Sequence, residues 1–159
     1  MRLSVRPIND WLADYDSSHR HATNKVLHWV CVPLIVVSLI GLLWALPTPA
    51  LFDGISEFLN WGTFFLAASM AYYCILSIKL ALGMLPFALM TAMLISWLDV
   101  ISVSLWLTST GIFIFAWAGQ FIGHWIEGQR PSFLKDLQFL MIGPLWLVAA
   151  IYRRMKISY

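Results

Sequence analysis

Four histidines are the side chains in this chain best suited to chemistry, and they fall in two short segments. Three belong to HRHATNKVLH, residues 19–28, and the fourth, His124, belongs to QFIGHWIEGQRPS, residues 120–132. Neutral imidazole is the commonest metal ligand in proteins. Both segments are therefore candidate parts of one metal site, with interfacial anchoring as the simpler alternative.

Helical spacing groups these histidines with other polar side chains. Asn24 and His28 share a helical face at spacing four, and Gln120, His124 and Glu127 form a stripe at spacings four and three. In this arrangement amide and carboxylate groups accompany the imidazoles, as they do around many metal sites.

His19 can meet His28 only if the helix breaks between them, because residues nine apart in a straight helix point to opposite sides. Thr23 and Asn24 are good capping residues and predict such a break. Three histidines with the Glu127 carboxylate would suit zinc or ferrous iron. The chain lacks the HExxH zinc pattern, so the spacing does not identify the metal.

The composition places these segments in a membrane protein. Of 159 residues, 60% are hydrophobic and 11% are charged, whereas about a quarter of residues are charged in soluble domains. Because a crossing helix needs about 20 apolar residues, the length predicts one domain of four or five spans. The composition excludes a soluble enzyme, and nucleic acid is not an expected partner.

We predict an all-α integral membrane bundle, with residues 1–159 as a single domain. Gly83 and Pro86 predict the turn between the second and third spans, and Gly143 and Pro144 a kink near the end. The expected elements are an interfacial segment over 1–25 with a short amphipathic helix, four spans over 26–46, 61–80, 84–100 and 104–125, and a kinked or re-entrant segment over 137–152.

Basic residues predict the sidedness, because short cytoplasmic loops collect lysine and arginine. All ten lie before the first span, near the second turn or after the fourth span, and none lies in the loops at 47–60 and 99–103. Both termini and both histidine segments are therefore expected at the cytoplasmic face, which is that of the inner membrane in a bacterium.

Together the two segments resemble the signature blocks of a known family. YDSSHRHATNKVLHWVCVP and AWAGQFIGHWIEGQRPSFLKDLQFLMIGP are similar to those of the membrane-embedded 2-hydroxy fatty acid dioxygenases, which act in phytosphingosine breakdown. His21 is not part of the family pattern. The matching positions are Tyr15, His19, Asn24, His28 and Pro33 in the first block, and Gln120, Gly123, His124, Glu127, Pro131 and Pro144 in the second.

The resemblance implies an iron(II)-dependent enzyme that uses O2 to shorten a 2-hydroxy fatty acid by one carbon, in the endoplasmic reticulum if the source is eukaryotic. His19, His28 and His124 would hold the Fe2+, with His21 and Glu127 as further candidate ligands. The substrate head would reach the metal from the cytoplasmic interface while the acyl chain stayed in lipid.

Six further side chains have expected roles around that iron. The candidate catalytic residues are Glu127, as a base or a support for the ligands, and Gln120 and Asn24, which are suited to orient ligands or bound oxygen. The candidate partners of the substrate carboxylate are Arg130, Lys25 and Arg20.

Three other functions fit the same histidines. Imidazoles at the ends of two spans can ligate haem and relay electrons without chemistry of their own. A zinc-dependent membrane hydrolase would use the same ligand types. A purely structural membrane protein would tolerate loss of the histidines.

Overall fold

The computed structural model describes residues 6–101, 104–130 and 138–159, and within these ranges the chain is helical with no strand. The predicted all-α class is confirmed. The helices are α1 (Ile8–Ser17), α2 (Ala22–Trp44), α3 (Ala50–Asp53), α4 (Trp61–Leu76), α5 (Ile78–Val100), α6 (Leu105–Glu127) and α7 (Gln138–Arg154).

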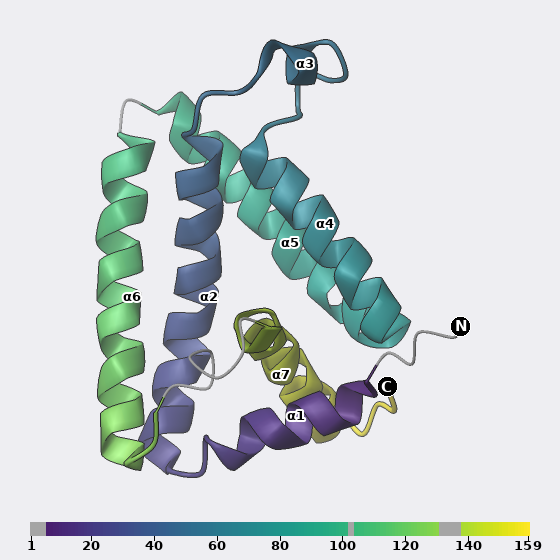
Figure 1. The fold of residues 1–159 in the computed structure, drawn as a ribbon, viewed down its shortest axis with the longest axis vertical. Coiled ribbons are helices and arrows are strands. Elements are labelled where there is room, and N and C mark those ends of the chain that lie inside the picture. Colours follow the sequence, from purple (N-terminus) through teal and green to yellow (C-terminus); the bar gives the residue numbers. More distant parts are fainter. Residues whose placement is uncertain (1–5, 102–103, 131–137) are drawn as a thin grey trace.

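The long helices form two pairs that meet at one end of the molecule and diverge toward the other. Helices α2 and α6 lie side by side, and α4 with α5 makes a second pair inclined to the first (Figure 1). Helices α1 and α7 lie at the divergent end, where α7 contacts α1, α2 and α5. These two helices therefore pack where the pairs separate.

Among the described residues, three helices are long and apolar enough to cross a membrane, namely α2, α5 and α6, each of 23 residues. Helix α4 is apolar but has only 16 residues. At 1.5 Å per residue it is about 24 Å long, against roughly 30 Å of bilayer hydrocarbon. The fourth crossing therefore stays a prediction.

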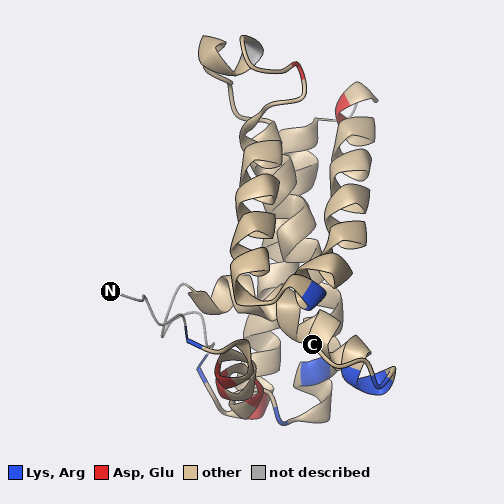
Figure 2. Cartoon of the chain, turned by 90° about the vertical axis from the view of Figure 1, so that its right-hand side faces the viewer, with Lys and Arg blue, Asp and Glu red and all other residues tan. Residues whose placement is uncertain are grey.

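Basic side chains gather at one end of the bundle, where the acidic residues of α1 also lie. Figure 2 shows the described lysines and arginines at the end that contains α1 and α7. The opposite end contains Glu57, in the connection before α4, and Asp99, at the end of α5. This distribution agrees with the expected positive face, and it puts both described ends of the chain at that face.

The turn predicted at Gly83 and Pro86 is wrong, because both residues lie inside α5. The break instead falls at Ser77, whose backbone is extended and whose hydroxyl accepts a hydrogen bond from the Leu80 N–H at 3.4 Å. Gly83 has a packing role. A Cβ there would lie 2.6 Å from the Tyr152 hydroxyl oxygen of α7, so the missing side chain lets α5 and α7 approach closely.

The last apolar segment forms one continuous helix, α7, with Gly143 and Pro144 inside it. Every residue from Ile142 to Ala149 is buried. A helix at the surface of a bundle exposes one face, so this burial means that neighbouring helices surround the middle of α7.

Because Gly83 lies in close contact with α7, replacement by alanine should have opposite effects on stability at Gly83 and at Gly111. Gly83→Ala should lower the free energy of unfolding by about 1–3 kcal/mol, because the new methyl overlaps Tyr152 and Val148. Gly111→Ala in α6 is the control, since its Cβ would meet no atom within 4 Å. It should raise stability by about 0.5–1 kcal/mol. Unfolding in detergent measures both, and equal effects would contradict the packing role.

Candidate metal centre

Three histidines from distant parts of the chain meet at the end of the bundle near α1. His19 comes from the connection between α1 and α2, His28 from α2 and His124 from the end of α6. All three are buried, and each offers a nitrogen within 4.8 Å of the others. The ring centroids are 4.2–5.0 Å apart.

The helix break that brings His19 to His28 lies earlier than predicted. Helix α1 ends at Ser17 and α2 begins at Ala22, with His21 as its N-cap. The His21 Nδ1 accepts a hydrogen bond from the Thr23 N–H at 3.2 Å. The expectation that Thr23 and Asn24 cap the helix is therefore wrong, and Asn24 is a buried residue of the first turn.

Two glycines of α6 allow α2 to approach closely enough for the histidines to meet. A Cβ on Gly123 would overlap the side chain of Asn24, and one on Gly119 would lie 2.6 Å from the Cys31 sulfur. His28 lies between these two α2 residues and His124 directly follows Gly123. Small residues at a helix contact permit such backbone approach.

The hydrogen bonds of two histidines determine where their protons lie. The His19 Nδ1 is 2.6 Å from the carbonyl oxygen of Tyr15, and the His28 Nδ1 is 2.9 Å from that of Asn24. A carbonyl only accepts hydrogen bonds, so both Nδ1 atoms must donate. In the neutral rings both Nε2 atoms then carry lone pairs, and they face each other at 2.8 Å.

A bound cation would satisfy these facing lone pairs. Two ligands about 2.1 Å from one ion and at right angles lie about 3.0 Å apart, close to the observed spacing. Burial lowers the pKa of His19, which keeps its ring neutral near pH 7 and available as a ligand. The His124 Nδ1 is also buried and has no partner among the described residues. The three side chains thus fit a transition metal.

Glu127 supports the histidine segment and does not join the group of ligand atoms. Its carboxylate accepts hydrogen bonds from the Arg20 N–H at 3.0 Å, the His21 N–H at 2.7 Å and the Asn24 side-chain amide at 3.1 Å. These bonds join the end of α6 to the turn that carries His19. These contacts suit Glu127 to hold this turn in place, which stays a prediction.

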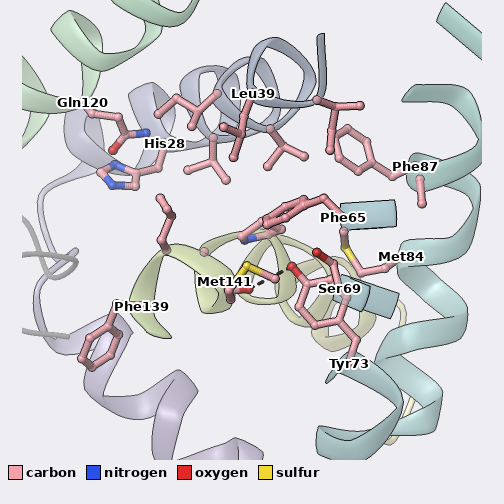
Figure 3. Close-up of a pocket in the computed structure, with 18 of the residues that line it drawn as sticks. His28, Leu39, Phe65, Ser69, Tyr73, Met84, Phe87, Gln120, Phe139 and Met141 are labelled. Carbon is pink, nitrogen blue, oxygen red and sulfur yellow. Dashed lines mark hydrogen bonds between the residues drawn. The ribbon is translucent and has the colours of Figure 1, made fainter. Parts of the chain in front are cut away.

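The other predicted residues divide between the site and the surface. Gln120 is 4% exposed, lies beside His28 (Figure 3), and its amide nitrogen has no partner in the described chain. The three candidate cations do not line the pocket at the histidines. Arg20 and Arg130 are exposed, and Lys25 is partly exposed.

Tyr15 belongs to the site although the sequence analysis gave it no role there. Its ring stacks on His19 with centroids 4.2 Å apart and planes 11° apart, and its carbonyl oxygen orients the same histidine. The available signals were its match to the family pattern and its spacing of four from His19 at the end of an amphipathic helix. The ring of Trp146 in α7 lies beside both of these rings. Its centroid is 5.6 Å from that of Tyr15 and 5.8 Å from that of His19.

The histidines open onto a pocket lined by residues of α2, α4, α5, α6 and α7. Most of its lining is apolar, as Figure 3 shows around Leu39, Phe65 and Phe87. No lysine, arginine, aspartate or glutamate is among the described lining residues. This composition suits a ligand with one polar end and a long apolar part.

Fold and site together define a helical membrane protein with a buried group of three histidines suited to a metal ion. The model of the Mpo1-like family, described as 2-hydroxy-palmitic acid dioxygenase Mpo1-like, matches residues 5–155. The chain belongs to this family, as the two sequence blocks indicated. No curated protein and no solved structure matches the chain significantly.

The geometry predicts which histidines are needed for metal binding. His19→Ala, His28→Ala and His124→Ala should each reduce bound metal from about one ion per chain to a small fraction of that, because each removes a ligand. His21→Ala should retain the metal, since this exposed ring caps α2. Elemental analysis of protein purified without a polyhistidine tag measures the content. Full retention in His124→Ala would rule out the site as described.

Glu127→Gln tests the support of the histidine turn separately. The amide would turn an N–H2 group toward one of the three donors, so the turn should loosen and metal affinity should fall by about 10–100-fold. Competition with a chelator measures the affinity. Glu57→Gln, at an exposed carboxylate in another part of the chain, is the control. Unchanged affinity in Glu127→Gln would contradict the role.

Proposed function

We propose that the protein is an iron(II)-dependent dioxygenase that shortens 2-hydroxy fatty acids by one carbon. The observation that carries this proposal is the pair of facing Nε2 atoms on His19 and His28, which lie at one end of an apolar pocket. The family description supports the reaction class and the substrate class.

The reaction balances without a further reductant. The bond between C1 and C2 of the 2-hydroxy acid breaks, C1 leaves as carbon dioxide, and C2 becomes the carboxyl carbon of the shorter acid. The substrate loses four electrons, and O2 accepts them as one oxygen atom enters the products and the other leaves as water. A ferrous ion held by the three imidazoles would supply the redox centre between substrate and O2.

The residues of the chain then bind and orient the polar end of the substrate. The unpartnered amide N–H2 of Gln120 is placed to donate a hydrogen bond to a carboxylate or hydroxyl oxygen of the acid. Tyr15 and Asn24 hold two of the imidazoles through their carbonyl oxygens. Apolar walls exclude bulk water, which strengthens these polar contacts.

Haem is a poor fit to the same histidines. Axial imidazoles on opposite sides of a haem iron lie about 4 Å apart with the porphyrin between them. The His19 and His28 nitrogens are 2.8 Å apart, which leaves no space for a porphyrin. A zinc-dependent membrane hydrolase could use the same ligands and the same apolar pocket, and the family description, which names a dioxygenase, favours the oxygenase.

The sidedness is part of the proposal. The described basic residues lie at the end of the bundle that carries α1 and α7, and this pattern favours a cytoplasmic location for that end. The histidines lie near it, so the polar head of a membrane-dissolved acid would reach them from the cytoplasmic interface of the bacterial inner membrane or the endoplasmic reticulum.

The proposal predicts a defined product. Protein loaded with ferrous iron should convert 2-hydroxypalmitic acid to pentadecanoic acid and carbon dioxide when O2 is present. Palmitic acid should remain unchanged, because it lacks the hydroxyl group whose carbon is oxidised. Mass spectrometry of the extracted acids measures both reactions.

Three controls define this experiment. Omission of O2, addition of an iron chelator and the His28→Ala variant should each abolish the product. Shortening that continues without O2 and iron would exclude the oxygenase. Retention of zinc in preference to iron, together with absence of shortening, would favour the hydrolase.

A further inference from the structure

The pocket at the histidines continues through the bundle as an apolar chamber, and α2 gives its length. One face of α2 lines it from His28 to Ile40. The helix rises about 18 Å between these residues, at 1.5 Å per residue. The lining residues between them, at spacings of three and four, are Val32, Ile35, Val36 and Leu39.

The chamber ends among apolar side chains of three helices. At this end Phe65 lines it from α4 and Ala88 from α5. Beyond them Ile40, Ile95 and Leu105 form a separate buried cluster, against which Phe65 also packs. Because this cluster fills the space between α2, α5 and α6, the chamber does not continue past it.

We propose that this chamber holds the acyl chain of the substrate and that Phe65 and Ala88 determine the longest chain it accepts. The inference rests on the proposed function and specifies its substrate. An extended hydrocarbon advances about 1.25 Å per carbon, so about 18 Å holds about 14 carbons. With C1 and C2 at the histidines, an acid of about 16 carbons fills the chamber.

This placement replaces the expectation that the acyl chain stays in lipid. Lipid would surround chains of any length equally, whereas a chamber that ends at packed side chains discriminates between them. Each methylene within the chamber contacts its apolar lining, whereas each one beyond the end must displace a packed side chain. Chain-length selectivity therefore distinguishes an acyl chain held in the chamber from one that stays in lipid.

Two substitutions should shift the selectivity in opposite directions. Phe65→Ala removes a ring at the closed end, so the preferred substrate should become longer than 2-hydroxypalmitic acid. Ala88→Leu fills part of the chamber, so the preferred substrate should become shorter. We expect each to change the ratio of kcat/KM between neighbouring even-numbered acids by about fivefold or more. The assay uses 2-hydroxy acids from lauric to arachidic length.

Matched controls lie on the outer face of α4. Phe64→Ala and Ala68→Leu make the same changes at exposed positions that do not line the chamber, and they should keep the selectivity of the unmodified protein. Opposite shifts by the two chamber variants cannot arise from partial unfolding. Unchanged selectivity in both variants would overturn the inference while leaving the proposed reaction intact.

A binding experiment separates failure of the inference from failure of the proposed function. A 2-hydroxypalmitic acid analogue with a diazirine at its methyl end should label peptides around Phe65 and Ile40 on irradiation. Labelling of these peptides without any turnover by the iron-loaded protein would support the chamber and count against the reaction. Labelling confined to exposed positions such as Phe64 would overturn the chamber.

Discussion

The close contact between α2 and α6 is the constraint on which the rest of the structure depends. It brings His28 and His124 together, and it requires Gly119 and Gly123, since side chains there would overlap Cys31 and Asn24. In a bilayer, lipid tails are as apolar as the helices, so association depends on such packing and on hydrogen bonds. The same contact places Glu127 where it can bind the turn at His19.

The site combines strong polar interactions with an apolar surrounding. Inside a low-dielectric region, facing lone pairs repel more strongly than they would in water. The carbonyl oxygens of Tyr15 and Asn24 fix the ring orientations of His19 and His28, and a bound cation would neutralise the repulsion between their Nε2 lone pairs. Metal affinity and local rigidity would therefore be two effects of one arrangement.

Much of this arrangement could be predicted from residue type and spacing. Helical periodicity placed Gln120, His124 and Glu127 on one stripe, and the apolar runs predicted the long helices. The turn at Gly83 was mispredicted because glycine marks close helix contacts as well as turns. The burial of α7 also could not be predicted from the sequence, since it depends on how two helix pairs diverge.

The bonds from Arg20 and His21 to Glu127 join positions 107 and 106 residues apart in the chain, which has a consequence for synthesis. A ribosome adds about 5–20 residues per second. Synthesis of α2, which ends at Trp44, is therefore complete about 4–17 seconds before Glu127 is added. During most of that interval the turn at His19 lacks its support and the third imidazole is absent, so a metal ion could be held by all three histidines only after α6 has been made.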